Sequence, residues 1–152
     1  MVGLGSRMGR DDGIGLSLVS DLAADDEALG ERCVLLEGAD MATLALFLME
    51  QASPVILVDA ADMGMAPGAY RLFDEQEARL ILRSDSVSTH GFGLAEGLGI
   101  ARALGFEAPV RIFGAQPFDL SFEPGLTDEM AAQYPELLSA LRRAVADATL
   151  DR

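Results

Sequence analysis

The chain contains no lysine and no tryptophan, and it has one histidine and one cysteine among its 152 residues. All 11 basic residues are therefore arginines, which excludes Schiff-base catalysis, a serine–lysine dyad and a phosphate-binding P-loop lysine. The single His90 excludes His-Glu-x-x-His zinc proteases and any site with several histidines. Cys33 alone cannot form an internal disulfide or a Cys/His zinc cluster. Catalysis must depend on carboxylates, on His90 or on a metal.

Positive charge is also scarce. Asp and Glu together number 25 and the formal net charge is −14, which argues against a nucleic-acid or anionic membrane partner. The longest apolar stretch, Met41–Met49, is about half of a bilayer span, and the first residues lack an export pattern, so we expect a cytoplasmic protein. Because 50% of the residues are apolar, the sequence predicts a single globular domain over residues 1–152.

Short β-type runs alternate with helical patterns along the chain. Strands are expected at 1–5, 33–36, 54–59, 69–73 and 109–113, and helices at 14–22, 41–50, 74–83, 93–104 and from 127 onward. Because parallel strands need crossovers, this order predicts a three-layer α/β fold with a mostly parallel, twisted sheet of about five strands, one antiparallel, flanked by helices. Segment 54–59 is typical of a central strand, and 69–73 is expected to pair with it through a long hairpin. Pro135 is expected to kink or restart the last helix.

The first loop carries two acids after a Gly-x-Gly turn. Gly3 and Gly5 suggest a dinucleotide fingerprint, but Asp11 and Asp12 would repel a pyrophosphate docked there. Capping of the following helix is the simpler role for either acid, because carboxylates bind the free N–H groups of a helix N-terminus. Ligand binding is the alternative role.

Two further polar positions lie at the ends of predicted elements. Asp59 closes the central strand, where open α/β sheets bind their ligands, and an ordinary turn-starting aspartate is an equally good description of it. His90 lies in a glycine-flanked loop, and its simpler role is that of a hydrogen-bonded loop residue. The topology allows Asp12, Asp59 and His90 to converge at one edge of the sheet. Two carboxylates and one imidazole would there form a half-open site for a divalent transition metal.

Several motifs occur in a fixed order along the chain: Gly3-Leu4-Gly5-Ser6, Asp11-Asp12-Gly13-Ile14-Gly15, Val58-Asp59-Ala60-Ala61-Asp62-Met63-Gly64, Pro67-Gly68, Ser88-Thr89-His90-Gly91 and Gly114-Ala115-Gln116-Pro117. Over nearly the whole chain, this series resembles the nickel–iron hydrogenase maturation endopeptidases. The resemblance implies a cytoplasmic protease that removes a short C-terminal extension from a hydrogenase large-subunit precursor after nickel has been inserted.

The same resemblance implies roles for particular residues. Asp12 and Asp59 would be catalytic, and together with His90 they would be the metal ligands. The nickel would be supplied by the substrate, the nickel-loaded precursor, so no tightly held metal of the protein's own is expected. Met63 and Met65 would form an adaptable apolar rim for the substrate peptide, although packing of the turn is their simpler role.

Gly91, next to His90, is the third expected substrate contact. Two mechanisms stay open: Asp12 or Asp59 activates a water while nickel polarises the scissile carbonyl, or the two carboxyl groups act as an aspartic-type pair. Two other functions compete, namely a non-cleaving nickel-sensing or substrate-holding protein of the same fold and a small metallohydrolase that acts on peptide fragments. Cys33 is expected to be a small buried hydrophobic residue rather than a nucleophile.

Overall fold

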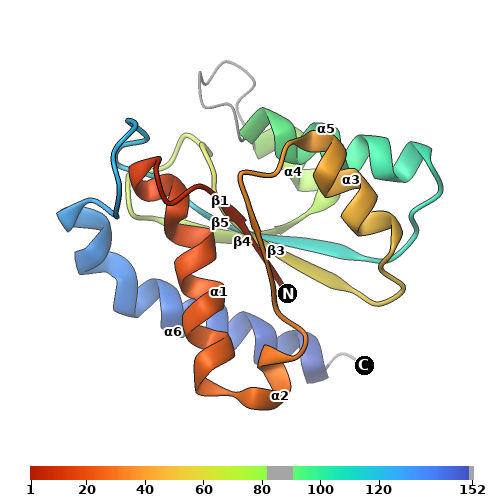
Figure 1. Cartoon of the computed structure of the whole chain (residues 1–152), viewed down its shortest axis with the longest axis horizontal. Helices are drawn as coiled ribbons and strands as arrows, with labels where there is room; N and C mark the ends of the chain where they lie inside the picture. The colour runs from red at the N-terminus through yellow and green to blue at the C-terminus, as the bar shows by residue number, and fades with distance from the viewer. Residues whose placement is uncertain (82–90, 151–152) are drawn as a thin grey trace.

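The protein is described by a computed structural model that covers residues 1–81 and 91–150. A five-stranded sheet lies between two layers of helices (Figure 1). Its strands, in the spatial order β2-β1-β3-β5-β4, are β1 (Val2–Gly5), β2 (Val34–Glu37), β3 (Val55–Ala60), β4 (Tyr70–Asp74) and β5 (Val110–Ala115). All neighbouring pairs are parallel except β4 with β5. The predicted α/β sheet with one antiparallel strand is therefore confirmed.

Helices cover both faces of the sheet. One face carries α1 (Ile14–Asp25), the short α2 (Glu27–Gly30) and α6 (Asp128–Leu150), and the other carries α3 (Met41–Met49), α4 (Glu75–Ile81) and α5 (Gly91–Ala103) (Figure 1). Asp40 accepts a hydrogen bond from the Thr43 amide at 2.8 Å and so caps α3. Within the described residues, none of these helices has the length and apolar character to span a membrane.

Each face of the sheet has its own apolar core, and β3 contributes to both. Leu57 packs in the core under α3 and α5, whereas its neighbour Val58 packs in the core under α1 and α6. This arrangement explains why β3 is apolar on both faces, as expected of a central parallel strand. Four apolar residues of α1, spaced as one face of a helix requires, are buried in this second core: Ile14, Leu18, Val19 and Leu22.

Glycines allow α1 to approach the sheet closely. A Cβ atom on Gly15 would overlap the carbonyl oxygens of Leu4 in β1 and Val58 in β3. Gly5, at the end of β1, has a φ of 126°, and a side chain there would collide with the carbonyl oxygen of Asp12. These contacts fix the first loop against the carboxyl ends of β1 and β3.

One expectation about the fold is wrong, and one of the two alternatives expected at Pro135 is excluded. β4 is antiparallel as expected, but its partner is β5 rather than β3, because β5 pairs in parallel with β3 from Val55↔Val110 to Ala60↔Ala115 and separates the two. Pro135 does not restart the last helix, since α6 runs without a break through this position. Pro135 is exposed, so water can reach the carbonyl group whose helical hydrogen bond the proline removes.

Candidate active site

Asp12 and Asp59 lie at the carboxyl ends of adjacent parallel strands. Asp59 is the residue before the last of β3, which ends at Ala60. Asp12 is in the short 3-10 turn Arg10–Gly13 that joins β1 to α1. Because β1 pairs with β3, their ends meet at one edge of the sheet. Each of the two acids is only 3% exposed. The structure thus brings the two predicted acids together in a buried position.

The environment of Asp59 favours its protonated form. Burial raises the pKa of Asp59 well above its usual value, and the charge of Asp12 raises it further, while a hydrogen bond from the Ala60 amide acts in the opposite direction. Its Oδ1 atom is buried and accepts no hydrogen bond from the described part of the chain. A proton or a cation bound at this oxygen would therefore be strongly stabilised.

A cavity of about 230 Å³ opens onto Asp59. It is bounded by the ends of β1 and β3 and by segments after β2, in α3 and in α5; its lining is Leu4, Gly5, Gly38, Ala39, Asp40, Met41, Leu44, Asp59, Gly93 and Leu94. Asp59 is the buried carboxyl group of this lining. A ligand can therefore reach Asp59 from the side on which α3 and α5 meet the sheet.

His90, the third predicted ligand, lies outside the described residues, and Gly91 is the first residue of α5. Residues 1–81 and 91–150 contain no group of three or more histidine, cysteine or acidic side chains placed to hold a metal ion. Gly93, which lines the cavity beside Asp59, follows His90 by three positions in the sequence. Convergence of His90 with the two acids stays a prediction.

Asp11 has a role that the sequence did not predict. It is fully buried and accepts hydrogen bonds from the amides of Phe118 at 2.9 Å, Asp119 at 3.2 Å and Thr127 at 2.9 Å. The Thr127 hydroxyl also donates to it at 2.9 Å. The expected capping of α1 is wrong for Asp11, because these donors belong to a distant loop and to the start of α6. Asp11 therefore anchors the turn that carries Asp12.

Gln116 organises the turn that follows Asp59. Its Oε1 accepts hydrogen bonds from the amides of Met63 at 2.8 Å and Met65 at 3.3 Å, and its Nε2 donates to Asp62 at 3.1 Å. The motif Gly114-Ala115-Gln116-Pro117 did not by itself predict a function for Gln116. Its position directly after β5, at the edge that carries Asp59, was the available indication.

The two methionines near Asp59 have different environments. Met63 is 8% exposed and belongs to the core under α3 and α5, whereas Met65 is 38% exposed. Packing of the turn is therefore the role of Met63, and of the two side chains only that of Met65 is exposed. Cys33 is partly buried, and burial raises the pKa of its thiol, which is the opposite of what an activated nucleophile needs.

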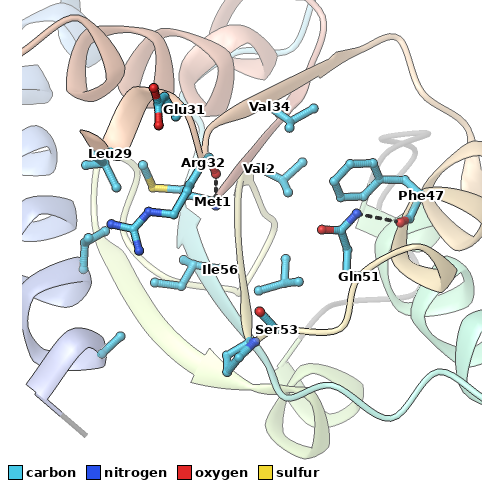
Figure 2. A pocket seen from close by; sticks show the side chains of 14 residues that line it. Met1, Val2, Leu29, Glu31, Arg32, Val34, Phe47, Gln51, Ser53 and Ile56 are labelled. Carbon is cyan, nitrogen blue, oxygen red and sulfur yellow. Dashed lines mark hydrogen bonds between the residues drawn. The ribbon is translucent and has the colours of Figure 1, made fainter. Parts of the chain in front are cut away.

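A second cavity, of about 360 Å³, lies at the opposite end of the sheet (Figure 2). Met1, Phe47 and Ile56 contribute apolar walls, and Arg32 and Glu31 lie at its side. This end of the parallel strands carries neither Asp12 nor Asp59. The smaller cavity at Asp59 is therefore the better candidate for the active site, in agreement with the rule that open α/β sheets bind ligands at the carboxyl ends of their strands.

Comparison with known proteins identifies the family. The profile of the family described as hydrogenase maturation protease matches residues 17–144. The hydrogenase expression/formation protein HupD of Thiocapsa roseopersicina is 25% identical over 163 residues, which cover 99% of this chain and 73% of the relative. The hydrogenase expression/formation protein HoxM of Azotobacter vinelandii is 29% identical over 150 residues, which cover 93% of this chain and 69% of the relative.

Solved structures show the same fold. The hydrogenase maturating endopeptidase HybD from E. coli superimposes with a TM-score of 0.73 at 24% identity, over 97% of this chain and 91% of the other. The [NiFe] hydrogenase maturation protease HybD from Thermococcus kodakarensis gives a TM-score of 0.70 at 21% identity, over 94% and 95% of the two chains. The family match over residues 17–144, supported by the shared fold, shows that the chain belongs to the hydrogenase maturation protease family.

Proposed function

We propose that this protein removes the C-terminal extension from the large-subunit precursor of a nickel–iron hydrogenase in the cytoplasm, after nickel has been inserted. The observation that carries the proposal is the buried pair of Asp12 and Asp59 beside a cavity open to a ligand. A peptide bond placed in this cavity would lie next to Asp59, whose carboxyl group is held toward its protonated form by burial and by the charge of Asp12. Such a pair supports general acid and general base chemistry.

Nickel enters this proposal as part of the substrate. Asp12, Asp59 and His90 would supply two oxygen donors and one imidazole, a set that suits a divalent transition metal. Three donors leave coordination positions open, which ligands from the precursor would fill. Productive binding at the site would therefore depend on the presence of nickel in the precursor. The protein would hold no tightly bound metal of its own. Met65 and Gly91 are the proposed substrate contacts near this site.

Two chemical routes are consistent with the carboxyl pair. In the first, the nickel polarises the scissile carbonyl, and Asp12 or Asp59 accepts a proton from the attacking water. A cation near Asp59 would favour its ionised form and so offset the rise in pKa that burial and Asp12 cause. In the second, protonated Asp59 donates to the carbonyl while ionised Asp12 activates the water. Only the first route requires the metal for the chemical step.

The test compares nickel-loaded with nickel-free precursor incubated with the purified protein. Shortening of the large subunit, measured by mass spectrometry, should occur only with the loaded form, because the protein alone does not complete the reacting geometry. His90→Ala and Asp12→Ala should block cleavage without unfolding the protein, and Asp59→Asn should be nearly as harmful. Asp26→Asn, a change at the cap of α2, is the matched control and should cleave normally.

Each contrary outcome points to a different function. Equal processing of both precursors, or full activity of His90→Ala, would contradict nickel sensing. Tight binding of the loaded precursor without shortening would indicate a substrate-holding protein, and cleavage of generic peptides would indicate a small metallohydrolase. Treatment with a chelator should leave the melting temperature of the isolated protein nearly unchanged, since an open site contributes little to folding. A large drop would show that the protein holds a structural metal.

A further inference from the structure

Strand β2 is an edge strand, the first in the spatial order of the sheet. Within the described residues it pairs with β1 on one side and with no strand on the other. The Val34 amide donates to the Met1 carbonyl at 3.0 Å, and the Gly38 amide donates to the Gly5 carbonyl at 2.8 Å. In a parallel ladder, the N–H and C=O of every second residue point to the same neighbour. The backbone groups of the residues between, Leu35 and Glu37, therefore point away from β1, toward the free side of the strand.

This free edge is short, but it carries few of the side-chain and backbone features that usually prevent pairing. Natural edge strands carry lysines, prolines or bulges. β2 has the sequence Val-Leu-Leu-Glu and stays in regular register with β1 over all four residues. Val34 and Leu35 are 38% and 39% exposed, and their side chains lie on opposite faces of the sheet. Glu37, the only charged residue of the strand, is paired with Arg7 at 2.6 Å.

The other edge strand differs. β4 has the sequence Tyr-Arg-Leu-Phe-Asp, and its Arg71 and Asp74 are both exposed. Arg71 also forms an ion pair with Glu77 of α4 at 2.8 Å, which places charge along that edge. Of the two edges, β2 is therefore the one suited to accept an added strand with apolar side chains.

The free edge leads to the candidate active site. Gly38, Ala39 and Asp40 follow β2 directly, and all three line the cavity that opens onto Asp59. A Cβ atom on Gly38 would meet no atom within 4 Å, so the space beside this turn is open. A polypeptide paired with β2 would therefore reach the mouth of the cavity as it leaves the strand.

We propose that the free edge of β2 binds the precursor segment next to its cleavage site as an added β-strand and so guides the scissile bond toward Asp12 and Asp59. The inference rests on the proposed function, which makes the occupant a polypeptide. An extended chain would exchange backbone hydrogen bonds with Leu35 and Glu37. Its apolar side chains would pack beside Val34 on one face of the sheet and beside Leu35 on the other.

A proline at position 35 tests this geometry. Leu35→Pro removes an outward-pointing N–H while the hydrogen bonds between β1 and β2 remain, because proline is tolerated where an edge strand faces solvent. Leu35→Ala is the matched control, since it shortens the same side chain and keeps the N–H. With nickel-loaded precursor, we expect Leu35→Pro to raise KM about tenfold relative to Leu35→Ala, with kcat nearly unchanged. Equal KM values for two folded variants would overturn the proposal.

A second measurement uses the unaltered protein, so it does not depend on the folding of a variant. Synthetic peptides that span the cleavage site of the precursor, each N-methylated at one position, compete with precursor cleavage. Strand pairing predicts that methylation weakens competition at every second residue, because alternate amides face β2. An effect without this alternation, or no competition by the unmethylated peptide, would overturn the proposal.

The outcomes separate this inference from the proposed function. If the unaltered protein does not shorten the loaded precursor, the proposed function fails. If it does, and Leu35→Pro cleaves with the KM of Leu35→Ala, only the inference about the edge fails. Light scattering adds a further check: a dimer that Leu35→Pro converts to a monomer without a change in KM would show that the edge binds a second copy of the chain, which would also overturn the proposal.

Discussion

The charge of Asp12 raises the pKa of Asp59, although α1, α2, β2 and α3 lie between the two residues in the sequence. The parallel order of β1 and β3 brings the two carboxyl groups to the same edge of the sheet. Both are buried there, so the fold holds two acids in an arrangement that opposes full ionisation. A buried pair of acids of this kind lowers the free energy of unfolding, and its presence is explained by chemical function rather than by stability.

Replacement of one acid should therefore stabilise the protein at neutral pH. The pKa of Asp59 is higher in the folded than in the unfolded state, so the folded state binds more protons, and stability falls as the pH rises above the unfolded value of about 3.9. We expect Asp59→Asn to raise the free energy of unfolding by about 1 kcal/mol at pH 7, with a smaller gain at pH 4. Urea unfolding at both pH values measures this. A variant that is less stable than the parent at pH 7 would contradict the prediction.

Loss of Asp11 should have the opposite effect on stability. Asp11→Ala leaves the buried amide of Thr127 and the partly buried amides of Phe118 and Asp119 without their acceptor, so we expect a loss of about 3 kcal/mol in urea unfolding. Asp40→Ala serves as the comparison, because Asp40 accepts one side-chain bond at an exposed helix end and its loss should cost much less. Equal losses in the two variants would show that the Asp11 contacts contribute little.

Gln116 should affect the turn after Asp59 in a pH-dependent way. Gln116→Glu keeps an acceptor for the amides of Met63 and Met65, but it replaces the donor to Asp62 with a second negative charge. We expect a lower melting temperature at pH 7 and partial recovery near pH 4, where the introduced glutamate, buried beside another carboxylate, binds a proton. Gln116→Ala should be destabilised at both pH values. Thermal melts of both variants across this range provide the measurement, and a pH-independent deficit in Gln116→Glu would argue against charge repulsion.

Two glycines of the helices should respond in opposite directions to alanine. Gly15→Ala would force a methyl group into the carbonyl oxygens of Leu4 and Val58, so we expect a loss of about 2 kcal/mol or more. Gly99 lies within α5 with no atom within 4 Å of a Cβ position, so Gly99→Ala should stabilise by about 0.5–1 kcal/mol. Chemical unfolding of the two variants checks the difference, and a neutral Gly15→Ala would show that α1 can move away from the sheet.

Most of the fold could be predicted because the elements alternate in a simple order and carry clear local patterns. The apolar run before Asp59 and the helical pattern at 41–50 are local features, and the strand and the helix that they indicate were predicted correctly. The partner of β4 was not, because pairing between strands that are consecutive in the sequence is only a tendency. The segment between β3 and β4 is held by Gln116, which follows β5, so the correct partner depends on a contact between distant parts of the chain.

The same distinction applies to the site. Asp12 and Asp59 could be singled out because each follows a predicted strand, and strand ends meet in a parallel sheet. The anchoring role of Asp11 could not be predicted, since its hydrogen-bond partners lie 107 to 116 residues away. Asp11 and Asp12 are neighbours in the sequence, so local patterns do not distinguish their roles. Only the tertiary structure shows that Asp11 binds backbone amides and that Asp12 lies beside Asp59.

The direction of β2 also determines where a label can be attached to this protein. Cys33 directly precedes β2, and Gly38, which directly follows the strand, lines the cavity beside Asp59. Cys33 therefore lies at the end of the sheet away from the site, and it is the single cysteine of the sequence. Its thiol is partly buried, and burial raises its pKa, so coupling needs an alkaline pH. A thiol-reactive label placed there should leave the cavity beside Asp59 open to the precursor.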